Sequence, residues 1–187
     1  MPEPSSFEST SFERAVDFVL AQEGGWTVDT GGATRYGISI QTYPDEDIAN
    51  LTQGRAKEIY RRDYWDALGL DELPNPVAVA MLDVAVNLGR KSAVKRLQRA
   101  VNLILGQTHL KVDGLLGPKT KGAVLDLASE PWQATILGML VAIGRLDIHY
   151  RLAAGSKYAP YIRGWAGRCV RLCKQLVLDQ TETNKEK

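Results

Sequence analysis

The sequence is poor in cysteine and histidine, and both shortages limit the chemistry available to the chain. The only two cysteines, Cys169 and Cys173, lie one helical turn apart in RCVRLCKQL, where side chains run roughly parallel and do not meet the geometry of a good disulfide. We interpret them as reduced thiols in or near the core. His109 and His149 are the only histidines, so the sequence offers no spaced set of zinc ligands. We expect no metal and no other cofactor.

Net charge and long apolar runs are also lacking. Lys and Arg total 23 against 22 for Asp and Glu, a formal net charge of +1, which gives no global field to attract nucleic acid or an anionic membrane. The longest apolar stretch, ATILGMLVAIG, is too short to span a bilayer. The N-terminal MPEPSSFESTSFERAV has neither the basic region nor the apolar run of a signal peptide. We therefore expect no nucleic-acid partner, no membrane anchor, and synthesis in the cytoplasm without a Sec signal.

The pattern along the chain predicts a mainly α protein with one small β lobe. Residues 1–11 and 179–187 are polar and predicted to be disordered. Residues 27–40 combine strand formers with turn chemistry, which predicts a small hairpin or three-stranded sheet. Residues 75–89 are apolar nearly all round and predict a central buried helix. Further helices are predicted over 11–22, 52–65, 91–105, 118–128, 131–153 and 159–178.

Glu23 is the most informative single residue. It follows an apolar helix, precedes Gly24, Gly25 and Trp26, and lies at the helix end where an acid is electrostatically unfavourable. The ordinary interpretation is a helix-end carboxylate. Apolar neighbours, and glycines that permit close approach, instead favour a catalytic proton donor, because such surroundings can keep a carboxyl protonated near neutral pH.

Six segments carry a resemblance to a known family. They are EGGW (23–26), GGATRYGIS (31–39), IYRRDYWDALGLDELP (59–74), DVAVNLGRKSAVKRLQRAV (83–101), VDGLLGPKT (112–120) and YIRGWAGR (161–168). In this order the chain resembles glycosidase family 108, the phage endolysins and secretion activator proteins of the lysozyme-like superfamily, which cleave peptidoglycan as N-acetylmuramidases.

The resemblance implies a domain organisation and a partner. Residues 12–89 would form a lysozyme-like catalytic region, an α+β fold. Residues 90–178 would form a helical region with a peptidoglycan-binding-like motif at VDGLLGPKT. Because no Pro, Gly or Ser-rich spacer precedes residue 91, we expect the second region to pack on the first. The motif can equally be a helix connector with glycines at positive φ.

The resemblance also implies a function. The leading expectation is a monomeric muramidase that hydrolyses the β-1,4 bond between N-acetylmuramic acid and N-acetylglucosamine. It would reach the wall in the periplasm after release by a phage holin or a secretion system. A lytic transglycosylase and a catalytically inactive wall-binding module are the alternatives.

Two further residues are candidates for the catalytic machinery beside Glu23. Asp29 could be a catalytic partner, or could serve only the turn in DTGG. The short TVDT replaces a longer insert of the family, so Asp29 has no single family acid to match. Thr34 could hold an attacking water, as the resemblance to phage lysozymes implies, or could simply favour a strand. We expect a cleft between residues 22–40 and the central helices, lined by Glu23, Thr34, Tyr36 and Asn87.

The candidate substrate-binding residues are aromatic and polar. Aromatic rings stack on the apolar faces of sugars but also fill cores. The aromatic candidates are Trp26, Tyr36, Tyr64 and Trp65. Asp83 and Asn87 lie one turn apart in the apolar helix, where unpaired polar groups are costly. They either bridge within the core or face the cleft and bind the acetamido group of a sugar.

Overall fold

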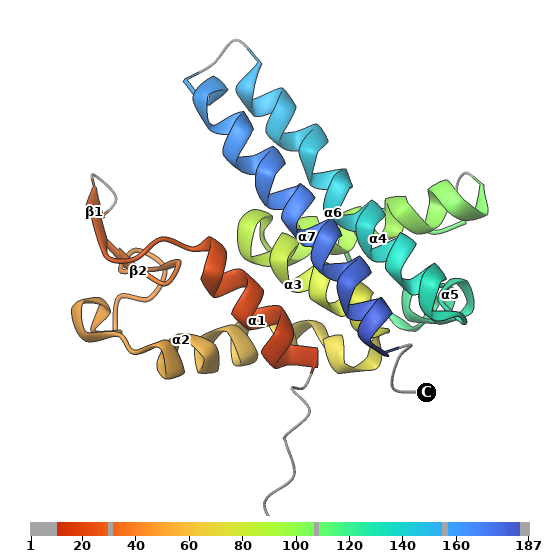
Figure 1. Ribbon diagram of the computed structural model, residues 1–187, viewed down its shortest axis with the longest axis horizontal. Helices are drawn as coiled ribbons and strands as arrows, with labels where there is room; N and C mark the ends of the chain where they lie inside the picture. The colour runs from red at the N-terminus through yellow and green to blue at the C-terminus, as the bar shows by residue number, and fades with distance from the viewer. Residues whose placement is uncertain (1–10, 30–31, 107–108, 155–156, 184–187) are drawn as a thin grey trace, which may run out of the picture.

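The computed structural model describes residues 11–29, 32–106, 109–154 and 157–183, and it confirms a mainly α fold with a small sheet (Figure 1). The central helix α3, Asn75–Leu88, packs against α1, α4, α6 and α7. The bounds of the other α-helices are Ser11–Gln22 (α1), Gln53–Tyr60 (α2), Arg90–Leu105 (α4), Pro118–Leu127 (α5), Pro131–Ala153 (α6) and Ile162–Thr183 (α7).

Helix α3 is central because it is apolar on every side. All residues from Val77 to Ala85 are buried, so the helix can be covered by neighbours all round. Pro76 lies in its first turn, and the backbone leaves the helix at Gly89 with φ of 81°, a conformation that glycine adopts without strain. This long buried element is the frame on which α1, α6 and α7 bring their side chains together.

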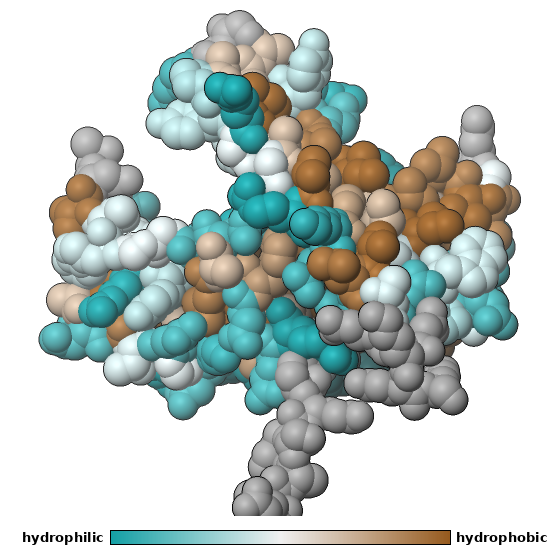
Figure 2. Space-filling view, viewed as in Figure 1, coloured by the Kyte–Doolittle hydropathy of each residue, from teal (hydrophilic) through white to brown (hydrophobic). Residues whose placement is uncertain are grey.

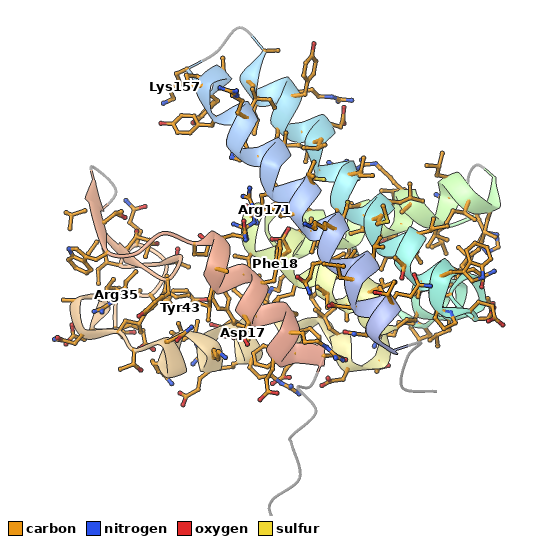
Figure 3. The ribbon with its side chains drawn as sticks, viewed as in Figure 1. Asp17, Phe18, Arg35, Tyr43, Lys157 and Arg171 are labelled. Carbon is orange, nitrogen blue, oxygen red and sulfur yellow. The ribbon has the colours of Figure 1, made fainter. Side chains whose placement is uncertain are left out.

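The β lobe is a three-stranded antiparallel sheet in the order β1 (Thr27–Asp29), β2 (Gly32–Arg35), β3 (Ile38–Ser39). Tyr36 and Gly37 form the two-residue connection between β2 and β3, with φ of 51° and 75°. Positive φ at both central residues is the mark of a type I′ hairpin turn. Arg35 ties the sheet to the following short 3-10 helix, Ile48–Asn50, because its Nη1 donates to the carbonyl of Ala49 at 2.6 Å (Figure 3).

Helices α6 and α7 pack together and continue beyond α3 as a two-helix arm (Figure 1). A one-turn 3-10 helix, Ala159–Tyr161, leads into α7 at the end of the arm. Figure 2 shows an open hollow between this arm and the β lobe. The C-terminal end of α1 points into the space between the two.

Two amides of α4 hold the segment that contains VDGLLGPKT (112–120). The side chain of Gln98 donates to Asp113 at 2.9 Å and accepts from the N–H of Gly114 at 2.9 Å. Asn102 pairs in the same two-way manner with the backbone of Leu110. Since α4 itself packs on α3 and α6, this segment is joined to the central helices. The division of the chain into two regions between residues 89 and 90 stays a prediction.

The helix predicted over 52–65 is present, as an α-helix to Tyr60 that continues as a π-helix over Arg61–Asp66. One predicted boundary was wrong. Residues 179–183 were predicted to be disordered, yet α7 continues to Thr183. A hydrogen bond of 2.6 Å from Gln175 to Asp179 supports that last part of the helix. None of the helices in the described ranges is both long and apolar enough to cross a membrane.

Candidate active site

Glu23 is the first residue after α1, and its backbone completes that helix. Its N–H donates to the carbonyl of Val19 at 3.0 Å. The side chain is 21% exposed, and its Oε1 accepts a hydrogen bond from Nη1 of Arg168 in α7 at 2.7 Å. One turn further along α7, Arg171 binds the side chain of Gln22 at 2.7 Å (Figure 3). Two arginines of α7 therefore fix the end of α1, and with it the position of the Glu23 carboxylate.

Behind Glu23 lies a buried network of charges contributed by three helices. Nε of Arg168 donates to Oδ1 of Asp83 at 2.7 Å, and Nη1 of Arg145 donates to Oδ2 of the same carboxylate. Asp83 and Arg145 are completely buried. Burial alone would lower the pKa of Arg168, but the carboxylates of Asp83 and Glu23 outweigh it and hold that pKa above its usual value. Arg168 thus stays charged and links Glu23 to the core.

The β2–β3 turn encloses Glu23 from the opposite side. A Cβ atom added at Gly37 would lie 2.5 Å from the hydroxyl of Tyr60, 2.9 Å from Cγ of Glu23 and 3.0 Å from its Cδ. Only glycine fits between these two side chains. By contrast, a Cβ at Gly24 or Gly25 would meet nothing within 4 Å. The glycine that permits close approach to Glu23 is therefore Gly37, and not the pair that follows Glu23 in sequence.

Tyr60 holds this turn in place. Its hydroxyl donates to the carbonyl of Tyr36 at 2.8 Å. Burial, followed by the charge of Glu23, raises the pKa of Tyr60 far above its usual range, so the hydroxyl remains a donor. Tyr36 is the one non-glycine residue with positive φ in the described part of the chain, a conformation that costs on the order of 1–3 kcal/mol. The hydrogen bond helps to offset that strain.

The structure corrects the substrate-binding interpretation of Asp83 and of Trp65. Both carboxylate oxygens of Asp83 are paired with arginines, and the residue is 0% exposed, which agrees with the alternative of a bridge inside the core. Trp65 is also 0% exposed. It packs edge-on against Phe12 with ring centroids 5.4 Å apart, and its indole N–H donates to Asp71 at 2.8 Å. Neither side chain can reach a sugar from these positions.

The other substrate-binding candidates lie nearer the surface. Trp26 is 48% exposed just before β1. Tyr64 lies 5.8 Å from Tyr60 between ring centroids and lines a surface pocket of about 330 Å³ next to Tyr43. Asn87 is half-buried and donates to the carbonyl of Asp83 at 2.7 Å. Their binding roles stay predictions.

Thr34 and Asp29 lie on neighbouring strands. Thr34 is half-buried in β2, opposite Thr27 of β1 and Ser39 of β3. Side chains alternate along a strand, so Thr34 faces the side of the sheet opposite to Ala33, which packs on the core. Asp29 ends β1 opposite Gly32, and the position of its side chain lies outside the described part of the structure. The catalytic roles of both residues stay predictions.

Sequence reasoning missed the residues that hold Glu23 in place. Arg168, Arg145, Tyr60 and Gly37 were not candidates. A signal for Arg145 was present, because Arg145 and Asp83 are isolated opposite charges in two largely apolar segments. Such charges are costly unless they pair. For Arg168 the only hint was its place in YIRGWAGR.

Comparisons with known proteins agree with this architecture. Residues 16–89 match the family described as glycosyl hydrolase 108. That match runs from α1 through α3 and includes Glu23, the sheet, Tyr60 and Asp83. No curated protein sequence is significantly similar to the chain. The solved structure of SagA from Brucella abortus is similar with a TM-score of 0.73 and 30% sequence identity, over 90% of this chain and 94% of that one. The chain therefore belongs to the glycosyl hydrolase 108 family and has its mainly α, lysozyme-like fold.

Proposed function

We propose that the protein is an N-acetylmuramidase that hydrolyses the β-1,4 bond between N-acetylmuramic acid and N-acetylglucosamine in peptidoglycan. The observation that carries the proposal is the way Glu23 is held. One carboxylate oxygen is fixed by Arg168, while Oε2 has no hydrogen-bond partner among the described residues. A carboxyl that is fixed at one oxygen and available at the other can approach a glycosidic oxygen in a defined orientation.

In this proposal Glu23 is the proton donor. It protonates the glycosidic oxygen as the bond to the anomeric carbon breaks, and the leaving sugar departs as a neutral alcohol. Arg168 acts as a positioning residue through its contact with Oε1. Gly37 and Tyr60 support the same carboxyl from the turn side, and they determine how closely the β lobe approaches it.

Water is the second reactant, and the β lobe supplies the candidates that would hold it. Thr34, assisted by Asp29, would place a water on the face of the sugar opposite Glu23, which gives inversion at the anomeric carbon. Thr34→Ala and Asp29→Asn should then each slow lysis without trapping a covalent intermediate. A glycosyl-enzyme adduct on Asp29, observed by mass spectrometry, would contradict inversion.

The products of sacculus digestion test the proposed function. Purified sacculi incubated with the protein should give fragments with reducing-end muramic acid, identified by mass spectrometry. Anhydromuramic ends would instead indicate a lytic transglycosylase, which needs no attacking water. Sacculi that remain intact but sediment with the protein would indicate a wall-binding module. Either of these results would overturn the proposed hydrolysis.

The site of action follows from the substrate. Peptidoglycan is the proposed partner, and the protein acts on it in the wall as a monomer. We propose that it reaches the wall through a holin or a secretion system. Expression with and without a co-expressed holin, followed by measurement of culture lysis, tests this route.

A further inference from the structure

One face of α7 changes from core to open surface within three turns. Tyr161, the residue just before α7, is followed on the same face by Trp165, Arg168 and Leu172, because these residues are spaced by four, three and four positions. Leu172 is 0% exposed, Arg168 9% and Tyr161 60%. The stripe therefore begins in the core, passes the Glu23 contact at Arg168, and ends in the open.

The exposed part of this stripe is a stack of rings. Trp165 stacks on His149 of α6 with centroids 4.4 Å apart and an interplanar angle of 25°. Tyr161 lies next, 6.1 Å from Trp165 at 29°. Successive ring planes are thus inclined by 25° and 29°, and the stack rests on a buried base, His149. The ring of Tyr158 packs at a tilt against Trp165, with centroids 6.4 Å apart, and against Tyr161, at 6.5 Å. Burial, followed by the charge of Arg145, lowers the pKa of His149 to about 4, so that base is an uncharged ring at neutral pH.

The position of the stack relative to Glu23 follows from the helix geometry. Arg168 and Tyr161 are seven positions apart, which is roughly 10 Å along the helix axis. Helix α3 covers α7 in the core, but the arm continues beyond it and borders the hollow that faces the β lobe (Figures 1 and 2). The stack therefore begins one turn from Arg168, the residue that binds Glu23, and it leads away from Glu23 along the same face of α7.

We propose that Tyr161 and Trp165 form a saccharide-binding site, on which a sugar ring of the glycan strand stacks outside the bond to be cleaved. The identity of the ligand rests on the proposed function. A pyranose has an apolar face that suits a flat, rigid aromatic surface. The continuity of the stripe with Arg168 favours a glycan over other occupants, because a strand held at Glu23 could extend along the same face of α7. The site would add binding contacts to a polymeric substrate without taking part in bond cleavage.

Binding can be separated from catalysis by working with Glu23→Gln as the parent protein. Its binding to purified sacculi is measured by sedimentation over a range of protein concentrations. Tyr161→Ala should weaken binding about fivefold to tenfold, and Tyr161→Gln should weaken it as much, because neither retains a ring. Tyr161→Phe should bind like the parent. Tyr150→Ala is the matched control, since Tyr150 is a 69% exposed tyrosine of the same arm outside the ring stack. Thermal melting checks that all variants are folded.

The outcomes distinguish this inference from the proposed function. If the wild type lyses sacculi but Tyr161→Ala and Tyr161→Gln bind as tightly as Tyr150→Ala, the stacking site is wrong and the muramidase proposal stands. If Tyr161 is needed for binding but the wild type releases no fragments, the stacking site stands and the muramidase proposal is wrong. A parent protein that does not sediment with sacculi would overturn the stacking site outright.

Discussion

Glu23 is held from two sides, and the two sides work by different physical means. On the helical side, α7 and α3 use charge: Arg168 binds Glu23 and Asp83, and Arg145 binds Asp83 from α6. On the sheet side, the β2–β3 turn uses shape, because Gly37 leaves no room for a Cβ beside Glu23.

The difference between the two sides has consequences for their roles. The charged side is buried and joins residues up to 145 positions apart in sequence, so it couples the site to the fold of the whole protein. The turn side is local and closer to the surface. We therefore expect substitutions on the charged side to reduce the stability of the fold above all. Substitutions on the turn side should reduce activity more than stability.

The largest expected effect comes from removing the buried anion. Asp83→Ala leaves Arg145 buried without its partner, which should lower the free energy of unfolding by about 3–5 kcal/mol. Urea denaturation measures the loss. The control is Asp147→Ala, which breaks an ion pair with Arg151 whose side chains are 51% and 77% exposed. That change should cost no more than about 1 kcal/mol. Equal losses in the two variants would show that the network does not support the fold.

Gly37→Ala tests the turn side. The new methyl group would collide with Tyr60 and Glu23 at a φ of +75°, so we expect a loss of about 1–3 kcal/mol in stability and a roughly hundredfold slower lysis. Gly122→Ala is the control, because Gly122 lies in α5 with nothing within 4 Å of an added Cβ. Alanine there should be neutral or slightly stabilising. Normal lysis by Gly37→Ala would show that the turn does not position Glu23.

A smaller effect concerns acid stability on the helical side. The pKa of His149 falls from 6.5 to about 4 on folding, through burial and the charge of Arg145. As the pH falls, His149 therefore binds a proton in the unfolded chain at a higher pH than in the folded chain. The free energy of unfolding should decrease as the pH falls from about 6.5 to about 4. His149→Phe keeps a ring against Trp165 but cannot be protonated. The melting temperature of this variant should depend less steeply on pH over that window. Identical slopes would contradict the assignment.

The fold was largely predictable because its helices can be recognised from the periodicity of their apolar residues and from the residues at their ends. The apolar segment 75–89 could only be a buried central helix, and it is. The predictions failed where the local sequence carries no signal for the structure that forms. The polar residues 179–183 look like a tail, yet they continue α7 because the preceding turns are anchored in the core by Leu172 and Leu176. The π-helix at Arg61–Asp66 has no sequence signal that we can identify.

The site was predictable in its central residue but not in its supports. Glu23 stood out because an acid at a helix end opposes the helix dipole. Its partners depend on tertiary contacts: Arg168 is 145 residues away, and the special role of Gly37 arises only when Tyr60 packs against it. Asp83 and Trp65 were candidates for substrate binding because polar and aromatic residues can serve either a core or a cleft. Burial decides between the two, and sequence does not reveal it.

The rate of sacculus lysis by Glu23→Gln tests the central claim most directly. Glutamine keeps the shape of the side chain and can still accept a hydrogen bond from Arg168, but it cannot release a proton. We predict that lysis, followed by turbidity, falls about a hundredfold or more while the melting temperature stays close to that of the wild type. Lysis at the wild-type rate would contradict the claim that Glu23 is the proton donor.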